Sequence, residues 1–176
     1  MDLFVLQCLT GKEDRVRTRI HQNTGSDAPL IHIPRRRMRI RRAGRMLDEE
    51  YLLFPGYLFI EADEISAKLL AVIRNIPEAM KFLPENQRVL PLGLAERELM
   101  ATLLYQGEVI GDSAVRFDDM QRISVIRGPL KGLEGHIVKV NRRKGRAKVR
   151  LDLYDRKFEV DFSFFDLEKA RDAENN

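Results

Sequence analysis

The sequence is poor in the residues that carry redox, metal and membrane chemistry. It contains one cysteine, Cys8, no tryptophan and three histidines in 176 residues. A single cysteine excludes an intramolecular disulfide and favours a cytoplasmic location over secretion. No apolar run approaches the roughly 18 residues that a membrane-spanning helix needs, and the N-terminus lacks the basic region of a signal peptide. We therefore expect a cytoplasmic protein with no membrane partner.

The sequence also lacks the residue patterns of catalytic and metal-binding sites. The three histidines, His21, His32 and His136, share no metal-ligand spacing with one another or with Cys8. Neither a phosphate-binding G-x-x-x-x-G-K-[ST] loop nor a dinucleotide-binding G-x-G-x-x-G turn occurs. Cys8 ends an apolar segment, which is typical of a buried and unreactive thiol. We predict a protein that has no metal, no cofactor and no enzymatic activity.

What the sequence does contain is basic charge concentrated in two short segments, although the formal net charge is only +4. The first segment has seven arginines and no acidic residue among them: Arg35, Arg36, Arg37, Arg39, Arg41, Arg42 and Arg45. The second lies nearer the C-terminus and holds Lys139, Arg142, Arg143, Lys144, Arg146, Lys148 and Arg150. Like charges at this density repel one another unless something offsets them. The clusters therefore indicate a surface that binds a polyanion such as nucleic acid.

Residues 53–60, Leu-Phe-Pro-Gly-Tyr-Leu-Phe-Ile, predict a strand that is entered through a fixed turn. Pro55 sets its own φ and has no N–H to donate, and Gly56 is free to take a positive φ. A period of two then places Tyr57 and Phe59 on one face and aliphatic side chains on the other. Because both faces are apolar, each needs a cover. One cover is the domain core, and the other is either more core or a partner protein.

The first hundred residues alternate between strand and helix patterns. We expect strands over 3–8, 30–33, 57–60 and 79–83, and helices over 12–21, 65–73 and 95–104. After the second strand, Arg37, Arg39 and Arg41 alternate with apolar residues, and Ala43-Gly44 can form a turn. This segment predicts a β-hairpin with one face almost entirely guanidinium. The element order suits an α+β domain built on an antiparallel sheet with flanking helices.

Beyond residue 106 the pattern changes to strands alone. Residues 107–118 are polar, contain two glycines and indicate a linker. Apolar and polar residues then alternate over 122–127, 135–140, 146–153 and 158–167, with glycine turns between them. Four or five short strands in about 50 residues predict a small all-β barrel. We therefore place one domain over 1–106, a linker over 107–118 and a barrel domain over 119–170.

Two stretches of the chain carry motifs that match a known protein family. Residues 123–140, with their Gly-Pro and Gly-x-x-Gly, are similar to a KOW motif, which ribosomal proteins and other transcription factors share. Phe-Val-Leu-Gln at 4–7, Phe-Pro-Gly-Tyr at 54–57 and a segment around Pro91 resemble the NusG N-terminal (NGN) domain. The two occur in the order of the NusG family of bacterial transcription elongation factors and cover nearly the whole chain. The resemblance implies an NGN domain followed by an SH3-like KOW barrel.

In this family the NGN domain binds the clamp helices of RNA polymerase through a hydrophobic face and touches the gate loop opposite. The positions that match these contacts are Gln7, Phe54, Tyr57, Phe59, Phe82, Ser66 and Lys68. In the barrel, Leu153 and Tyr154 match the turn that docks partners such as ribosomal protein S10 or the Rho factor. The resemblance also implies a monomer that favours elongation over pausing.

Specialised members of the family also touch nucleic acid, and the arginine hairpin is similar to that of the LoaP-type antiterminators. Proteins of that type recognise an RNA hairpin and act on particular long operons. The residues expected to contact nucleic acid are Lys12, Arg15, Arg19, Arg35, Arg36, Arg37, Arg39, Arg41, Arg42, Arg45 and Arg74. Since guanidinium groups pair with phosphates and stack on bases, an RNA hairpin and upstream or non-template DNA are both possible targets.

These features predict a transcription elongation and antitermination factor that binds RNA polymerase and nucleic acid and promotes processive read-through. The alternative is a KOW-containing ribosomal or RNA-binding protein with no role at the polymerase. A helical C-terminal domain that masks the clamp-binding face, as in RfaH-type members, is disfavoured. The reason is that residues 147–153 alternate with the period of a strand.

Overall fold

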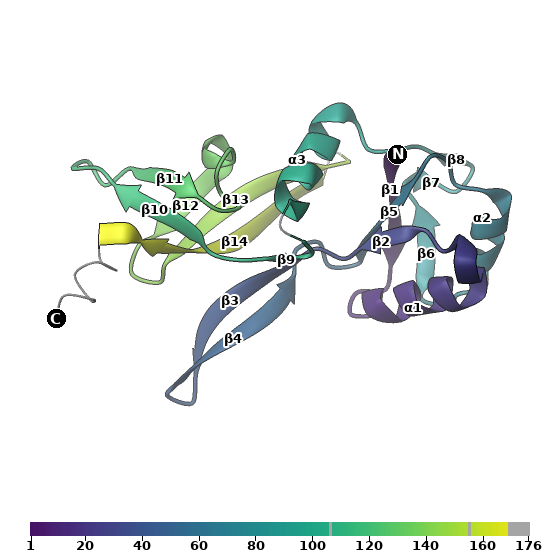
Figure 1. Cartoon of the computed structure of the whole chain (residues 1–176), viewed down its shortest axis with the longest axis horizontal. Coiled ribbons are helices and arrows are strands. Elements are labelled where there is room, and N and C mark those ends of the chain that lie inside the picture. The colour runs from purple at the N-terminus through teal and green to yellow at the C-terminus, as the bar shows by residue number, and fades with distance from the viewer. Residues whose placement is uncertain (106, 155, 169–176) are drawn as a thin grey trace. The chain divides into compact units, whose positions relative to one another are not determined.

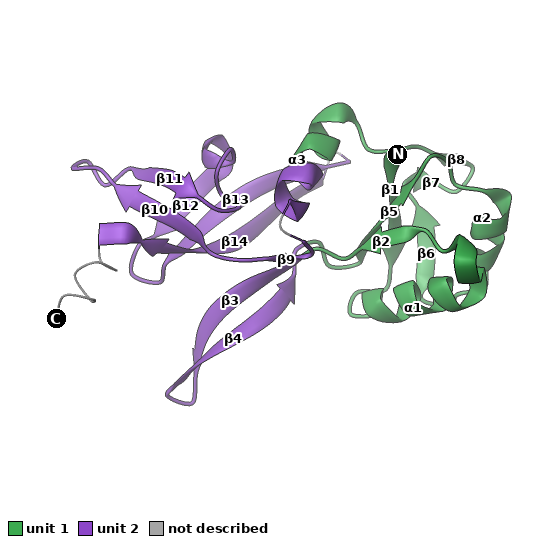
Figure 2. Ribbon diagram, in the orientation of Figure 1, with its two compact units in different colours: residues 1–34, 54–99 green, residues 35–53, 100–176 purple. Residues whose placement is uncertain are grey.

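The structure is a computed structural model that describes residues 1–105, 107–154 and 156–168. The chain divides into two compact units (Figure 2): unit 1 holds Met1–Pro34 and Phe54–Leu99, and unit 2 holds Arg35–Leu53 and the chain from Met100 onward. The arginine hairpin therefore groups with the C-terminal half of the chain, although the sequence predicted one domain over 1–106. Two of the predicted domain limits, residues 106 and 170, lie outside the described residues.

Unit 1 is built on a four-stranded antiparallel sheet in the order β2-β5-β1-β6 (Figure 1). Its strands are β1 (Asp2–Cys8), β2 (Leu30–His32), β5 (Tyr57–Ala62) and β6 (Ala79–Phe82). The other elements that begin in unit 1 are α1 (Glu13–Thr24), the 3-10 turn Gly25–Asp27, α2 (Ala67–Arg74), α3 (Leu94–Leu104) and a small ribbon of β7 (Pro84–Glu85) and β8 (Arg88–Val89). The predicted strands and helices of this region are confirmed.

In unit 1 the apolar side chains that the sequence periodicity predicted to face inward are buried. Val16 and Ile20, four residues apart on α1, are both fully buried, as are Leu58 and Ile60 on β5. The helix α2 begins after Ser66, whose hydroxyl accepts a hydrogen bond from the backbone N–H of Leu69 at 3.2 Å. This cap satisfies one of the amide groups that a helix N-terminus leaves without a partner.

Unit 2 contains the predicted hairpin, formed by β3 (Arg35–Arg42) and β4 (Arg45–Leu52). A short strand, β9 (Val109–Ile110), pairs in parallel with β3 and completes a three-stranded sheet. The turn residues Ala43 and Gly44 have φ values of +49° and +79°. Two successive residues at positive φ are typical of a type I′ turn, which matches the twist of the strands that it joins.

The rest of unit 2 is the small all-β barrel, whose sheet runs in the order β11-β10-β14-β13-β12. Its strands are β10 (Ser113–Phe117), β11 (Ile123–Arg127), β12 (Ile137–Asn141), β13 (Arg146–Leu153) and β14 (Arg156–Asp166), with a 3-10 turn over Glu134–His136. The alternation on β13 is confirmed: Ala147, Val149, Leu151 and Leu153 are each no more than 1% exposed. The chain therefore has the α+β and all-β parts that the sequence predicted.

The prediction of a linker over residues 107–118 is wrong for its second half. Residues Ser113–Phe117 form β10, which pairs with β11 on one side and with β14 on the other. Ser113 is fully buried, and its hydroxyl accepts a hydrogen bond from the N–H of Leu130 at 3.0 Å. The apolar pattern of β10 was not recognised in the sequence, because the strand begins with a serine and serine is more typical of loops.

Within the described part of the chain, no helix is long and apolar enough to cross a membrane.

Candidate functional site

The turn before β5 is held in place by two neighbouring elements of unit 1. Gly56 has a φ of +86°, and its N–H donates to Oε1 of Glu13 on α1 at 2.6 Å. The carbonyl of Gly56 accepts from the N–H of Cys8 at the end of β1, at 2.8 Å. Glu13 is only 2% exposed, so this carboxylate is a buried acceptor dedicated to the turn. The turn therefore fixes where β5 enters the sheet.

Cys8 lies beside this turn and is unreactive by environment. Burial raises the pKa of its thiol to about 12, and the nearby carboxylate of Glu13 adds to the effect. The thiol is therefore protonated at neutral pH and is not a nucleophile. This agrees with the buried thiol that the sequence predicted.

The register of the sheet decides which aromatic residues share a face. Gln7 on β1 pairs with Tyr57, and Val5 pairs with Phe59, so Gln7, Tyr57 and Phe59 lie on one face. Phe54 packs edge-on against Phe59, with ring centroids 5.4 Å apart. Three of the residues expected at the polymerase-binding face are thus brought together with Gln7.

Phe82 does not belong to this group. It pairs with Leu6 of β1, which also pairs with Leu58 of β5, so Phe82 lies on the opposite face of the sheet and is fully buried. The expectation that Phe82 joins the docking face is therefore wrong. The sequence could not show this, because the side of the sheet on which β6 places a residue depends on its register with β1.

The aromatic residues are less exposed than a docking surface requires. Phe54, Tyr57 and Phe59 are 1%, 4% and 0% exposed, so none of the three rings is accessible at the surface of this structure. Gln7 is half-buried on the same face, and Lys81, which pairs with it, is exposed. The three rings therefore belong to the core of unit 1, whereas Gln7 and Lys81 on the same face of the sheet stay partly or fully accessible.

Ser66 and Lys68, expected to touch the polymerase gate loop, are both exposed at the start of α2, Ser66 as the cap and Lys68 in the first turn. Ser66 caps the helix, as described above. Nζ of Lys68 lies 2.6 Å from Oδ2 of Asp27, and this hydrogen bond lowers the pKa of Asp27. The structure therefore brings the two residues together at one helix end.

The basic residues expected to touch nucleic acid from unit 1 divide into two kinds. Arg15 and Arg19 both form ion pairs with Glu78, each at 3.1 Å, so one carboxylate holds two guanidinium groups. Lys12 and Arg74 are exposed. Glu78 is 12% exposed, which indicates that Arg15 and Arg19 have a structural role in addition to any contact with a ligand.

The sequence predicted a hairpin with one face almost entirely guanidinium, and this prediction is wrong. In the register of β3 and β4, Arg37 pairs with Glu50 and Arg39 pairs with Asp48. The return strand thus places acidic side chains on the same face, and Nε of Arg39 lies 3.2 Å from Oδ1 of Asp48. Among the described residues, the guanidinium groups of Arg37 and Arg41 make no ion pair, and both side chains are exposed.

The opposite face of the hairpin is turned inward. The side chain of Arg36 is therefore not free to contact nucleic acid, although the sequence predicted that contact. Its half-buried guanidinium donates a hydrogen bond to the carbonyl of Asp161 on β14, and burial lowers its pKa. The same guanidinium lies 6.0 Å from the ring centre of Tyr51. Arg36 therefore attaches the hairpin to the barrel. The neighbouring Met38 is 3% exposed.

The remaining hairpin arginines lie near its two ends. Arg42 lies 3.8 Å from Glu49 in an exposed ion pair, and Arg45 is exposed. The backbone N–H of Arg35 donates to the carbonyl of Glu108 at 2.7 Å, next to β9. The structure thus keeps Arg37, Arg39, Arg41, Arg42 and Arg45 accessible.

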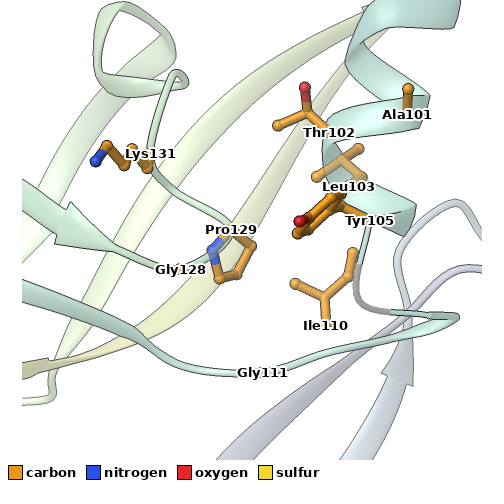
Figure 3. Close-up of a pocket in the computed structure, with 9 residues that line it drawn as sticks. All are labelled: Ala101, Thr102, Leu103, Tyr105, Ile110, Gly111, Gly128, Pro129 and Lys131. Atoms are coloured by element: carbon orange, nitrogen blue, oxygen red, sulfur yellow. The ribbon is translucent and has the colours of Figure 1, made fainter.

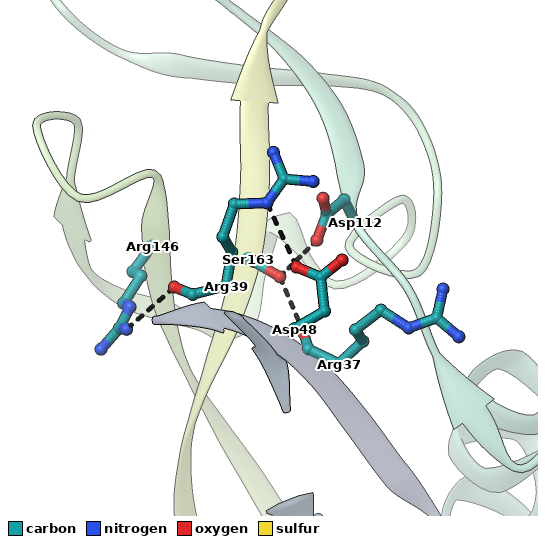
Figure 4. Close-up of polar contacts among 6 residues, drawn as sticks. All are labelled: Arg37, Arg39, Asp48, Asp112, Arg146 and Ser163. Atoms are coloured by element: carbon teal, nitrogen blue, oxygen red, sulfur yellow. Dashed lines mark hydrogen bonds and ion pairs between the residues drawn. The ribbon is translucent and has the colours of Figure 1, made fainter. Parts of the chain in front are cut away.

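The free edge of β3 is covered by side chains of the barrel (Figure 4). Oγ of Ser163 lies 3.0 Å from the carbonyl oxygen of Arg37 and also bonds to the carboxylate of Asp112. Nη2 of Arg146 lies 3.5 Å from the carbonyl oxygen of Arg39. An exposed strand edge is a site of unwanted strand pairing, and these contacts block it.

The barrel turn expected to dock partner proteins has one buried and one accessible residue. Leu153 is 1% exposed and belongs to the barrel core, so the expectation that it contacts a partner directly is not met. Tyr154 is half-buried and has a φ of +47°. Of the two residues predicted to dock partner proteins, Tyr154, at the end of β13, is the one whose side chain stays partly accessible.

A cavity of about 480 Å³ in unit 2 lies between the end of α3 and the turn after β11 (Figure 3). Leu103, Tyr105 and Ile110 line it opposite Pro129, and Lys131 is its one basic residue. The lining holds no carboxylate or histidine, so it offers no acid–base pair. Among the described residues, no group of three or more His, Cys, Asp or Glu side chains could hold a metal ion.

Comparison with known proteins gives a consistent result over nearly the whole chain. A family model described as "Transcription termination factor nusG" matches residues 1–101. The chain is 26% identical over 181 residues to the transcription termination/antitermination protein NusG of Synechocystis sp., which covers 94% of this chain and 88% of that protein. It is 27% identical over 157 residues to the protein of that name from Streptococcus pyogenes, covering 86% of each chain.

A solved structure described as "Domain interaction in Thermotoga maritima NusG" is similar in fold. Its TM-score is 0.57 at 21% identity, and the match covers 92% of this chain and 93% of that one. At this level of identity the likeness concerns the fold alone.

Proposed function

Because the chain belongs to the NusG family of transcription termination and antitermination factors, we propose that it binds RNA polymerase through unit 1 and RNA through the arginine hairpin. Factors of this family act with RNA polymerase. In this proposal the protein bridges polymerase and a structured leader RNA and promotes read-through of terminators. It is then a specialised antiterminator of the LoaP type rather than a general elongation factor.

The polymerase-binding surface in this proposal is the sheet face that carries Tyr57 and Phe59. These rings are buried in the core of unit 1, and the accessible residues Gln7 and Lys81 of the same face make the first contact with the clamp helices. Phe54 supports the face through its edge-on contact with Phe59. Ser66 and Lys68 at the start of α2 are the proposed contacts with the gate loop.

The observation that carries the nucleic-acid part is the exposed row of Arg37, Arg39 and Arg41 on strand β3 of the hairpin. Arg37 and Arg41 have no ion pair among the described residues, although Glu50 lies opposite Arg37 in the register of the hairpin. The pair between Arg39 and Asp48 is exposed at both ends. Exposed pairs contribute about 1 kcal/mol or less, so a phosphate can replace Asp48 at little cost.

RNA is our proposed target rather than duplex DNA, because guanidinium groups read splayed bases and phosphates together and the minor groove of an RNA stem is wide and shallow. Upstream or non-template DNA is the competing ligand for the same arginines. The proposed partner-docking residue of the barrel is Tyr154, with ribosomal protein S10 or Rho as the partner class. We propose that the factor acts as a monomer.

Transcription in vitro over an intrinsic terminator, with and without a candidate leader RNA upstream, tests the proposal. We expect read-through that requires both the protein and the leader, and we expect Arg37→Glu with Arg41→Glu to abolish it. A matched control reverses two exposed arginines elsewhere, Arg88→Glu and Arg116→Glu, with the same change in net charge. Read-through that is independent of the leader would instead indicate a general elongation factor.

The second candidate function is that of a KOW-containing ribosomal or RNA-binding protein. Co-purification distinguishes it from the proposed polymerase-binding factor. A polymerase-binding factor elutes with core RNA polymerase, whereas the alternative elutes with ribosomal subunits only. The match over residues 1–101 favours the first outcome, because it covers the region before the barrel.

A further inference from the structure

The proposed function does not involve the cavity of about 480 Å³ that lies between the end of α3 and the turn after β11 (Figure 3). The residues that line it, within 101–131, all belong to unit 2, so we call it the unit 2 cavity. Its volume lies within the range of about 300 to 1,000 Å³ that is typical of small-molecule sites. An apolar cavity of about 150 Å³ already holds one benzene ring, so the unit 2 cavity has room for a fused-ring molecule.

The walls of the unit 2 cavity are mainly apolar. Leu103 on α3 and Ile110 on β9 are 2% and 3% exposed, so their side chains connect the cavity to the core of unit 2. Tyr105 is 86% exposed, and its ring points from α3 towards Pro129 (Figure 3). Aromatic rings prefer stacked or edge-on partners, and a flat ligand between Tyr105 and Pro129 would supply one. The walls therefore favour an aromatic ligand.

The charge at the edge of the cavity comes from Lys131. Among the described residues its ammonium group makes no ion pair, and no acidic residue belongs to the cavity lining. The carboxylate of Glu134, three residues further along the chain, instead accepts from the backbone N–H of Gly132 at 2.7 Å. The side chain of Lys131 is exposed, and its flexible stem allows the ammonium group to reach an anionic group at the cavity mouth.

The turn that carries Pro129 and Lys131 is held in place by its own backbone and by the start of β10. Gly128 has a φ of +101°, and an added Cβ would lie 2.7 Å from Cα of Ser113. The N–H of Leu130 donates to Oγ of Ser113 at 3.0 Å. The N–H of Lys131 donates to the carbonyl of Gly128, also at 3.0 Å. This wall is therefore preformed, and a ligand loses little affinity in ordering it.

We propose that the unit 2 cavity binds a small amphipathic carboxylate with a flat aromatic body. The body lies in the apolar space between Tyr105 and Pro129, and the carboxylate pairs with Nζ of Lys131 at the mouth. A neutral molecule of the same shape leaves Lys131 without a partner, and a molecule with several charges would have to bury charge against apolar walls. None of the residues assigned above to polymerase or nucleic acid lines the cavity, so the inference is independent of the proposed function.

Isothermal titration calorimetry of the full-length chain with naphthoate tests the proposal. Naphthamide is the matched probe, because it has the same two rings and no charge. We expect saturable binding of one naphthoate per chain and about tenfold weaker binding of naphthamide, a difference of about 1.4 kcal/mol. In nuclear magnetic resonance spectra, the backbone amide shifts caused by naphthoate should concentrate at Leu103, Ile110 and Gly128.

Two variants separate the charge from the ring. Lys131→Gln should weaken naphthoate binding about tenfold and leave naphthamide binding unchanged. Tyr105→Ala should weaken the binding of both probes about fivefold, because both lose the same aromatic contact. Lys157→Gln removes an exposed charge elsewhere on the barrel and is the control for net charge. Thermal melting establishes that all variants are folded, which is expected because each replaced side chain is exposed.

Three results would overturn the proposal. The first is naphthoate binding that does not saturate, or amide shifts that lie outside the cavity walls. The second is equal affinity for naphthoate and naphthamide, which rules out recognition of the carboxylate. The third is an equal loss of naphthoate affinity in Lys131→Gln and Lys157→Gln, which would be an effect of net charge alone. Read-through and polymerase binding are measured separately, so each of these results leaves the proposed function standing.

Discussion

The carboxylate of Glu13 on α1 accepts a hydrogen bond from the backbone N–H of Gly56, with 2.6 Å between Oε1 and N. This contact joins residues 43 positions apart and ties the first helix to the turn before β5. Because the carboxylate is 2% exposed, water cannot replace it as the acceptor. The strand that carries Tyr57 and Phe59 thus depends on a polar group from another element.

We predict that Glu13→Ala lowers the free energy of unfolding by about 1 to 3 kcal/mol, since the mutation leaves a buried N–H without an acceptor. Glu13→Gln retains an acceptor oxygen and should lose less. Urea denaturation followed by circular dichroism measures both. Asp14→Ala removes the exposed neighbour, which pairs with Arg17 at 3.0 Å, and serves as the control. Equal stabilities of the Glu13→Ala protein and the wild type would contradict this role.

Gly56→Ala should also destabilise the protein, by about 1 to 3 kcal/mol, because its φ of +86° is unfavourable for a residue with a side chain. The added Cβ would lie 3.1 Å from Oγ1 of Thr10 and 3.2 Å from the carbonyl oxygen of Cys8. At Gly135 no atom lies within 4 Å of an added Cβ. Thermal unfolding of Gly56→Ala and Gly135→Ala should therefore show a large shift only for the first.

The raised pKa of Cys8 predicts how stability varies at alkaline pH. The folded pKa of about 12 exceeds the ordinary value of 9.0, so the folded protein holds the thiol proton more tightly than the unfolded chain does. Stability from this group is complete below pH 9 and is lost as the pH rises from 9 towards 12. The loss approaches about 1.4 kcal/mol per pH unit.

Comparison with Cys8→Ala isolates this effect from other groups that titrate at high pH. The difference in unfolding free energy between the two proteins should shrink as the pH rises from about 8 to about 10.5, because the upper pH lies above the ordinary pKa of a thiol. In parallel, a thiol reagent at pH 8 should label Cys8 only after denaturation, an outcome expected for a buried, protonated thiol. Rapid labelling of the folded protein would contradict the burial.

Arg36 and Arg37 are neighbours with opposite predicted effects on the hairpin. Arg36→Ala should loosen the hairpin from the barrel, because it removes the donor to the carbonyl of Asp161 and the packing over Tyr51. Hydrogen exchange of the amides of β3 and β4 should then accelerate at least several-fold. Arg37→Ala, whose guanidinium is exposed, should leave exchange unchanged and weaken RNA binding. A reversed pattern would show that the two faces of the hairpin were misassigned.

Gln7 and Lys81 lie on the same sheet face as Tyr57 and Phe59. Substituting them tests polymerase binding without disturbing the core. Tyr57→Ala would remove a ring that is 4% exposed and would cost about 3 to 5 kcal/mol of stability, so lost binding would be ambiguous. Lys81→Glu changes an exposed residue on the same face. We expect it to weaken binding to core RNA polymerase about tenfold, which corresponds to about 1.4 kcal/mol.

Biolayer interferometry with immobilised core polymerase measures this change, and unfolding curves verify that the variant is as stable as the wild type. Lys131→Glu, an exposed lysine of the barrel, is the matched control. Unchanged affinity in Lys81→Glu together with Gln7→Glu would argue against the proposed face.

Local patterns were sufficient for most elements of this protein. A positive-φ turn at Ala43-Gly44 and the alternation on β13 depend on neighbouring residues only, so the sequence predicted both the hairpin and the barrel strand. The turn at Pro55-Gly56 is local in the same sense. The resemblance of the Phe-Pro-Gly-Tyr stretch to NusG also pointed correctly to the family.

The role of each arginine and aromatic residue instead required contacts between distant segments. Period two separates Arg36 from Arg37, but only packing on β14 shows that Arg36 is the one turned inward. Register with β1 sends Phe82 to the face opposite Tyr57, and β10 is a strand because β11 and β14 pair with it. Periodicity assigns side chains to faces, whereas the partner that covers each face comes from residues far away in the chain.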